Sequence, residues 1–303
     1  MFSVPEIYYK IFGLHHKLMT SKVKRFTNLL RYVGGKSKAI KALYTYFPVF
    51  NVYIEPMCGG ASIFFYIIIT RRERLKRIII NDIDKNLIDF YISVRDNVDE
   101  LINVVSKKVK DLQVGNKDNM NLLRLFLDDR IENAANYYIR NRISFSGMTY
   151  KHAYSMDAHI KFLNSKYDQK LRYASELMQG VEIYNKDYSE VLSEQDINDY
   201  DNIFVFLDPP YYSNKNNKLY GLDGRIHLNF DHERLRNFMH DHIERFKFLI
   251  TYDKDDYIMN LYKDFCEIDT YNLQYCMQSN KEGKSKMVLE YAIYNYKKPG
   301  TLF

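Results

Sequence analysis

Residues 51–84 read NVYIEPMCGG ASIFFYIIIT RRERLKRIII NDID. The segment 51–54 predicts a strand, and the Gly59-Gly60 pair after it predicts a turn. The residues from Ser62 to about Arg74 predict a helix, and the apolar run 77–80 predicts a second strand. Strand, glycine turn, helix and strand make a βαβ unit, which favours a parallel sheet with a right-handed crossover. We therefore expect an α/β fold.

The strand signals are interrupted in the middle of the chain. Residues 92–180 are charged and compatible with helices, notably at 101–112 and 122–140, so we expect a mainly helical insertion there. Another helix is expected from near Lys85. Strand signals return later, at residues 181–184, 203–207, 246–251 and 289–294. The expected parts are an N-terminal extension, residues 1–24, a catalytic domain, residues 25–91 and 181–303, and the insertion between its two halves.

The composition limits the location and the partners. Hydrophobic residues make up 46% and charged residues 27% of the chain, as in ordinary globular proteins. The net charge of +6 permits binding to a polyanion but does not require it. The three cysteines are too widely spaced for a zinc site or a disulfide framework, which favours a reducing compartment. The longest apolar run, Ala61 to Ile69, is too short to span a bilayer, which takes about 20 residues.

The first chemical signal is Asp208-Pro209-Pro210-Tyr211, directly after the strand predicted at 203–207. The two prolines fix a stiff turn at the carboxyl end of that strand, where open α/β sheets bind their ligands. The turn offers a carboxylate, free carbonyls and an aromatic ring. These groups suit a flat base that carries an exocyclic amine. A strand stopped by proline, with an Asp in the turn, is the alternative from these four residues alone.

A second signal concerns a cofactor. Asp82 ends its predicted strand at the spacing from the glycine turn at which an acidic residue reaches ribose hydroxyls. The turn is neither G-x-G-x-x-G nor a P-loop, so a ligand with a ribose and no phosphates, such as S-adenosylmethionine, fits better than NAD or ATP. Upstream, Gly34-Gly35 permits a tight loop over a ligand, and Lys36 suits a carboxylate. A helix cap for Asp82 and a basic surface turn at Lys36 are the alternatives.

Taken in order, these motifs resemble those of the Dam-type (alpha-class) DNA adenine-N6 methyltransferases. The matching segments are Tyr32-Val33-Gly34-Gly35-Lys36, Glu55 to Ser62, Asn81 to Asp84, Asn141 to Met148, Asp208 to Tyr211, Phe230 to Leu235 and Glu290 to Tyr296. Ala61 stands where the family has a third glycine, and we expect its methyl group to fit. Ser146 stands where the family's recognition segment has Asn, so the family's target specificity is not carried over.

The resemblance implies a Rossmann-like, S-adenosylmethionine-dependent methyltransferase sheet. It implies site-specific methyl transfer to N6 of an adenine that is flipped out of double-stranded DNA. In the catalytic motif, it implies that Asp208 and the Pro209 carbonyl hold the amine, that Pro210 stiffens the turn and that Tyr211 stacks on the base. The cofactor residues that it implies are Tyr32, Lys36, Glu55, Gly59, Gly60, Asp82, Asp187 and Asp208. For Asp187 a surface turn is an equal alternative, and no metal is implied.

The expected partner is double-stranded DNA, and a cognate restriction endonuclease is a candidate partner. Candidates for DNA contacts are Arg140, Asn141, Arg142, Lys151, Lys215, Lys218, Arg225, Lys284 and Lys286. A solvated face is an alternative for Lys151. We expect an intracellular protein, cytoplasmic or nucleoid-associated, or placed in the host cell if it is viral. Monomer and homodimer both remain open.

Three other functions use the same fold. Cytosine-N4 methylation shares the amine chemistry, but its tetrapeptide usually begins with Ser, so Asp208 favours adenine. RNA adenine methylation shares the catalytic motif, and the segment Asn141 to Met148 favours DNA instead. A catalytically silent nucleic-acid-binding relative is the third alternative. Four intact residues count against it, namely Lys36, Gly59, Asp82 and Asp208.

Overall fold

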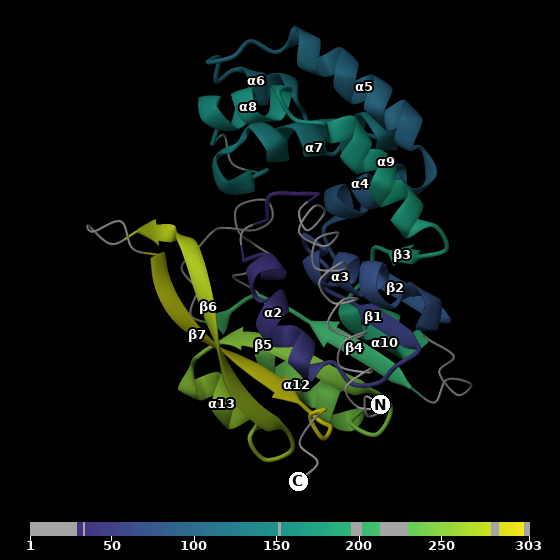
Figure 1. The fold of residues 1–303 in the computed structure, drawn as a ribbon, viewed down its shortest axis with the longest axis vertical. Coiled ribbons are helices and arrows are strands. Elements are labelled where there is room, and N and C mark those ends of the chain that lie inside the picture. The colour runs from purple at the N-terminus through teal and green to yellow at the C-terminus, as the bar shows by residue number, and fades with distance from the viewer. Residues whose placement is uncertain are drawn as a thin grey trace, which may run out of the picture.

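The structure is a computed structural model that describes residues 29–32, 34–150, 153–194, 202–212, 230–279 and 285–299. In Figure 1 a β-sheet with its covering helices forms one end of the molecule, and a group of helices forms the other. The predicted N-terminal extension, residues 1–24, lies outside the described residues. Among the described residues, no helix combines the length and apolar character that crossing a membrane requires.

The sheet has seven strands in the order β3-β2-β1-β4-β5-β7-β6. Their bounds are β1 Val52–Glu55, β2 Arg77–Asn81, β3 Glu182–Tyr184, β4 Ile203–Leu207, β5 Lys247–Asp253, β6 Glu267–Ser279 and β7 Ser285–Tyr294. The first five strands of this order are parallel, and β7 is antiparallel to both β5 and β6. The predicted α/β fold class with a Rossmann-like sheet is confirmed. The edge strand β6 was not predicted.

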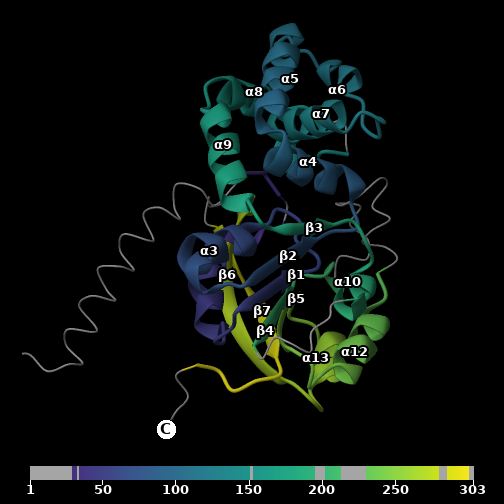
Figure 2. The same cartoon turned by 90° about the vertical axis from the view of Figure 1, so that its right-hand side faces the viewer.

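Helices cover both faces of the sheet (Figure 2). One face carries α3 Ser62–Arg71, and the other carries α10 Tyr188–Glu194, α12 His232–Asp241 and α13 Asp256–Tyr262. Strand β4 shows why its run is apolar throughout: Phe204 and Phe206 pack into the first core, while Val205 and Leu207 pack into the second. A strand with two buried faces has no polar side to alternate with.

The group of helices at the other end comes between β2 and β3 in the chain. It contains α4 Lys85–Asp96, α5 Val98–Asp111, α6 Asn119–Leu122, α7 Arg130–Ile143, α8 Met156–Leu163 and α9 Tyr167–Met178. The helix predicted at 122–140 was placed too early. Asp129 caps α7 by accepting a hydrogen bond from the Glu132 backbone, so the helix begins at Arg130. The boundaries of the insertion as a unit stay a prediction.

The remaining helices of the described residues are short. They are η1 Lys36–Lys38, α2 Ile40–Leu43, η2 Tyr44–Tyr46, η3 Arg72–Arg74 and η4 Phe145–Gly147. Ala61, at the start of α3, has φ of 53°, in the left-handed region that favours glycine. Its methyl group is buried at the start of α3, and the backbone there adopts a conformation that glycine reaches more easily than alanine.

Candidate active site at the carboxyl ends of the parallel strands

Asp208 lies directly after β4 and is held by residues from two other parts of the chain. The Lys36 ammonium nitrogen is 2.6 Å from Asp208 Oδ1. The Thr251 hydroxyl, on the neighbouring strand β5, donates to the same oxygen over 2.8 Å. Lys36 is only 3% exposed, whereas Asp208 is 23% exposed. The carboxylate is therefore fixed from the protein side and still accessible from outside.

Lys36 is surrounded by acidic groups. Burial alone would lower the pKa of Lys36. Three carboxylates outweigh that effect and raise its pKa; they belong to Asp208, Glu290 and Asp253. Burial raises the pKa of Asp208 itself, and Lys36 opposes that change. The ammonium also lies 4.8 Å from the ring centroid of Tyr211, within cation–π range. The sequence predicted separate ligands for Lys36 and Asp208, and the structure brings the two side chains together.

The glycine turn after β1 is packed against Tyr32. A Cβ atom on Gly59 would lie 2.8 Å, and one on Gly60 2.7 Å, from side-chain atoms of Tyr32. Gly59 also has φ of +46°. Its backbone N–H donates to Asp82 Oδ2 over 2.9 Å, and its carbonyl accepts from the Tyr91 hydroxyl. These two glycines are needed so that the aromatic ring can lie on the turn.

Two acidic side chains flank this turn. Burial raises the pKa of Asp82 to about 6. Burial also raises the pKa of Glu55 to about 8, although the Tyr53 hydroxyl donates to Glu55 over 2.6 Å and the Phe64 backbone donates as well. Glu55 thus binds the first turn of α3 from inside the core. Asp82 is half-buried and remains accessible at the end of β2.

The helix cap that was the alternative role for Asp82 is provided by Asp84. Asp84 caps α4 by accepting from the backbone of Asn86 and Leu87, while Asp82 Oδ1 accepts from the Asp84 backbone. The Tyr150 hydroxyl also donates to Asp84. The two carboxylate oxygens of Asp82 therefore accept hydrogen bonds from two different turns. Oδ2 accepts from the backbone of the glycine turn, and Oδ1 accepts from the backbone of the turn that follows β2.

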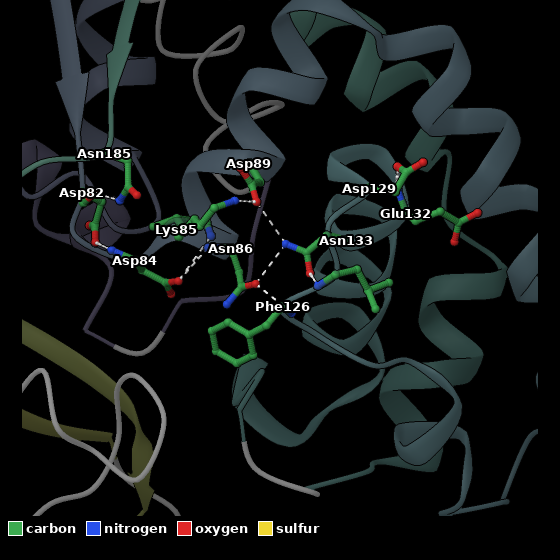
Figure 3. Close-up of polar contacts among 12 residues, drawn as sticks. Asp82, Asp84, Lys85, Asn86, Asp89, Phe126, Asp129, Glu132, Asn133 and Asn185 are labelled. Atoms are coloured by element: carbon green, nitrogen blue, oxygen red, sulfur yellow. Dashed lines mark hydrogen bonds and ion pairs between the residues drawn. The ribbon is translucent and has the colours of Figure 1, made fainter.

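An amide network joins this acidic turn to the helical insertion (Figure 3). Asn86 Oδ1 accepts from the Asn133 side chain over 2.9 Å and from the Phe126 backbone over 3.3 Å. Asn133 also donates to Asp89, which pairs with Lys85. In Figure 3 the two amides face each other between the Asp82 turn and α7. The turn after β2 and the insertion are thus connected by buried polar contacts.

The residues predicted to contact DNA fall into different environments. The Arg140 guanidinium is buried and donates to the carbonyls of Met120, Leu123 and Thr149, so this side chain is turned inward and its predicted DNA contact is not supported. Asn141 is also fully buried, with its amide on the Arg31 backbone. Both side chains hydrogen-bond within the protein, and their DNA contacts stay predictions.

Arg142 is different, since its side chain is partly exposed, although its Nε is buried and has no hydrogen-bond partner within the described residues. A partly exposed guanidinium suits a phosphate oxygen. Lys286 lies on β7, but its side chain is not described. The other predicted contacts lie outside the described residues; they are Lys151, Lys215, Lys218, Arg225 and Lys284.

Asp187 follows β3 and pairs with Arg234 on α12. Its two carboxylate oxygens accept from the Arg234 guanidinium over 2.8 and 3.0 Å, and the Ser189 hydroxyl donates to it as well. These contacts lower the pKa of Asp187 although burial opposes them. These contacts are those of a surface turn, and the cofactor contact of Asp187 stays a prediction.

Sequence reasoning missed Thr251, Arg31 and Tyr150. Thr251 lies inside an apolar strand, where nothing in the local pattern distinguishes it from a packing residue. Arg31 and Tyr150 each adjoin a recognised motif, but their partners lie far along the chain, as the 110-residue separation of Arg31 and Asn141 illustrates. Only the folded chain brings such pairs together.

Several methyltransferases are similar to this chain in sequence. A type II methyltransferase, M.MjaIII of Methanocaldococcus jannaschii, is 26% identical over 204 residues, which cover 60% of this chain and 68% of that protein. Type II methyltransferase M1.LlaDCHI of Lactococcus lactis subsp. cremoris is 24% identical over 60% of this chain and 64% of its own length. A DNA N-6-adenine-methyltransferase of Escherichia phage P1 is 25% identical, over 40% of this chain and 16% of its own.

Among solved structures, the rRNA methyltransferase aviRa from Streptomyces viridochromogenes covers 84% of this chain and 80% of its own, with 12% identity and a TM-score of 0.34. The family match is extensive: the D12 class N6 adenine-specific DNA methyltransferase model matches residues 32–276. This range includes the Lys36 loop, the glycine turn, the insertion and the Asp208 motif. The chain belongs to the D12 class N6 adenine-specific DNA methyltransferase family.

Proposed function

We propose that this chain transfers a methyl group from S-adenosylmethionine to N6 of an adenine that is flipped out of double-stranded DNA. The observation that carries the proposal is the arrangement around Asp208. Among the described residues, Lys36 and Thr251 both bind Oδ1 of Asp208. Oδ2 is then the acceptor available to an amine, in a side chain that keeps part of its surface exposed.

The chemistry of the site supports this cofactor. Burial raises the pKa of Glu55, and the nearby carboxylates of Asp208 and Asp82 raise it further. A site with crowded carboxyl groups suits a cationic ligand. S-adenosylmethionine, when bound, supplies a methyl group on a positively charged sulfonium. The half-buried Asp82 suits its ribose hydroxyls, and the ring of Tyr32 covers the glycine turn beside it.

The chain's own groups hold the target amine. One N–H of the adenine amine donates to Asp208 Oδ2, and the other donates to the Pro209 carbonyl. This orients the nitrogen lone pair, and such alignment contributes several kcal/mol to a reaction. Tyr211 stacks on the flipped base, which is worth about 1–3 kcal/mol. Lys36 favours the ionised form of Asp208, and an ionised carboxylate accepts hydrogen bonds without donating any.

Substitution of Asp208 tests this proposal. Asp208→Ala should reduce transfer of tritiated methyl groups to DNA at least about a thousandfold, because the amine loses its main acceptor. Binding of S-adenosylmethionine, measured by calorimetry, should persist and weaken far less than methyl transfer does. Asp208→Asn keeps the shape of the side chain and serves as the folding control. Near-normal turnover of a folded Asp208→Ala chain would show that the assigned chemistry is wrong.

We also propose that the chain acts at a specific DNA sequence, inside a cell, beside a cognate restriction endonuclease. The relatives whose names describe type II methyltransferases support this part of the proposal. Sequencing of methylated adenines in DNA treated with the purified protein tests the specificity. Methylated positions scattered without a shared sequence would contradict it.

A further inference from the structure

Asn141 makes an unusual contact for a residue of the recognition segment. Its Oδ1 accepts from the Arg31 backbone N–H over 2.8 Å, and its Nδ2 donates to the Arg31 carbonyl over 2.8 Å. Nδ2 also donates to the carbonyl of Gly147 over 3.2 Å and to the Thr149 hydroxyl over 3.3 Å. The amide therefore satisfies both backbone groups of Arg31 and has no donor left for a DNA base.

Two further sets of contacts hold the same segment against Arg31. The Arg31 guanidinium donates to the carbonyls of Ser144 and Arg142, over 2.9 and 3.4 Å. Gly147 has φ of +77°, and a Cβ atom there would lie 1.8 Å from the Arg31 carbonyl oxygen. The recognition segment thus contacts Arg31 from its side chain, its backbone and a glycine that admits no larger residue. We call the contacts among Arg31, Asn141, Ser144 and Gly147 the Arg31 joint.

The Arg31 joint leads directly into the active site. The next residue, Tyr32, places its ring on Gly59 and Gly60, and the Tyr32 carbonyl accepts from the Gly35 backbone over 3.1 Å. Lys36 follows with its ion pair to Asp208. A shift of the backbone at Arg31 would therefore move both the ring over the glycine turn and the ammonium beside the catalytic carboxylate.

We propose that Asn141 is a positioning residue, which acts through Arg31 to hold Tyr32 and Lys36 in place for cofactor binding and methyl transfer. This inference rests on the proposed function and adds that the DNA-reading segment and the cofactor site are mechanically joined at Arg31. Binding at one of them is then linked to binding at the other.

Two matched variants of α7 test the inference. Asn141→Ala removes the amide on Arg31. Asn136→Ala removes another buried amide of the same helix, which donates over 2.7 Å to the Arg124 carbonyl, within the insertion. The full chain is titrated with S-adenosylmethionine by calorimetry, and with duplex DNA by fluorescence anisotropy. We expect Asn141→Ala to weaken cofactor binding at least about tenfold and DNA binding less than about threefold. Asn136→Ala should change neither, although both variants lower the melting temperature.

Several outcomes would overturn the inference. One is an Asn141→Ala chain that binds the cofactor normally and loses DNA affinity, because Asn141 would then be a DNA contact. Another is equal loss of cofactor affinity in both variants, which would indicate general destabilisation. If Asn141→Ala does not fold, Asn141→Asp replaces it: the acceptor for the Arg31 N–H remains and the donor is lost. Wild-type cofactor affinity in that variant would also overturn the inference. A wild-type chain that does not bind S-adenosylmethionine would instead overturn the proposed function, and the inference with it.

Discussion

At the scale of single residues, the site depends on one hydroxyl that lies outside every motif. Thr251→Val keeps the shape of the side chain and removes the donor to Asp208, while Thr251→Ser keeps the donor. A hydrogen bond to a charged group is worth about 1.5–3 kcal/mol, so the valine variant should lose about tenfold or more in kcat. The serine variant should stay near the wild type, and the KM for the cofactor should change little in both. Steady-state methylation assays measure this, and equal kcat values for valine and serine would contradict the role of Thr251.

Glu55 predicts how stability depends on pH. Burial raises the pKa of Glu55 to about 8 in the folded chain, whereas an unfolded Glu titrates near about 4.3. Between these values the folded chain binds a proton that the unfolded chain has released. The free energy of unfolding should therefore decrease as pH rises from about 4.3 to about 8, and level off above that. Urea denaturation between about pH 5 and pH 9 measures the slope. Glu55→Gln should flatten it, and an unchanged slope in that variant would assign the effect to another group.

At the scale of elements, the left-handed turn after α7 sets a steric limit. Gly147 and Gly180 both have positive φ, but a Cβ on Gly147 would meet backbone at 1.8 Å, whereas one on Gly180 would meet a flexible Arg72 side chain at 3.4 Å. Gly180→Ala should cost about 1 kcal/mol, from the backbone conformation alone. Gly147→Ala should cost about 3 kcal/mol or more, because the Arg31 joint has to open. Chemical denaturation of both variants measures the difference. Equal losses in the free energy of unfolding would mean that the Arg31 joint accommodates a methyl group at residue 147 without opening.

The elements also show what the sequence can and cannot predict. Strands β1, β2 and β4 were predictable because burial on both faces makes the interior of each strand apolar. Strand β6 was missed, since it lies at the edge of the sheet and mixes polar with apolar residues. Asp82 and Asp208 were predictable because each follows a recognisable strand. The contacts of Thr251 and Asn141 were not, because they depend on a neighbouring strand and on a residue 110 positions away.

At the scale of the whole molecule, the mild positive charge predicts DNA binding that weakens with salt. Arg142→Ala removes a partly exposed guanidinium and should lower the slope of log affinity against log salt by about 1. Arg172, an exposed arginine of α9 that pairs with Asp99, is the matched control, and Arg172→Ala should leave the slope unchanged. Anisotropy titrations at several salt concentrations measure both slopes. Equal slopes for Arg142→Ala and the wild type would exclude a phosphate contact.

The order of the strands also determines when during synthesis a nascent chain can become active. Strand β1 lies in the interior of the sheet and pairs with β2, which follows soon after it, and with β4, which follows the whole insertion. Lys36 leaves the ribosome long before Asp208, and Thr251 emerges later still. Helices of the insertion, whose contacts are more local, can form while the site is still incomplete. We therefore expect truncated translation products that end before β5 to leave the genome unmodified.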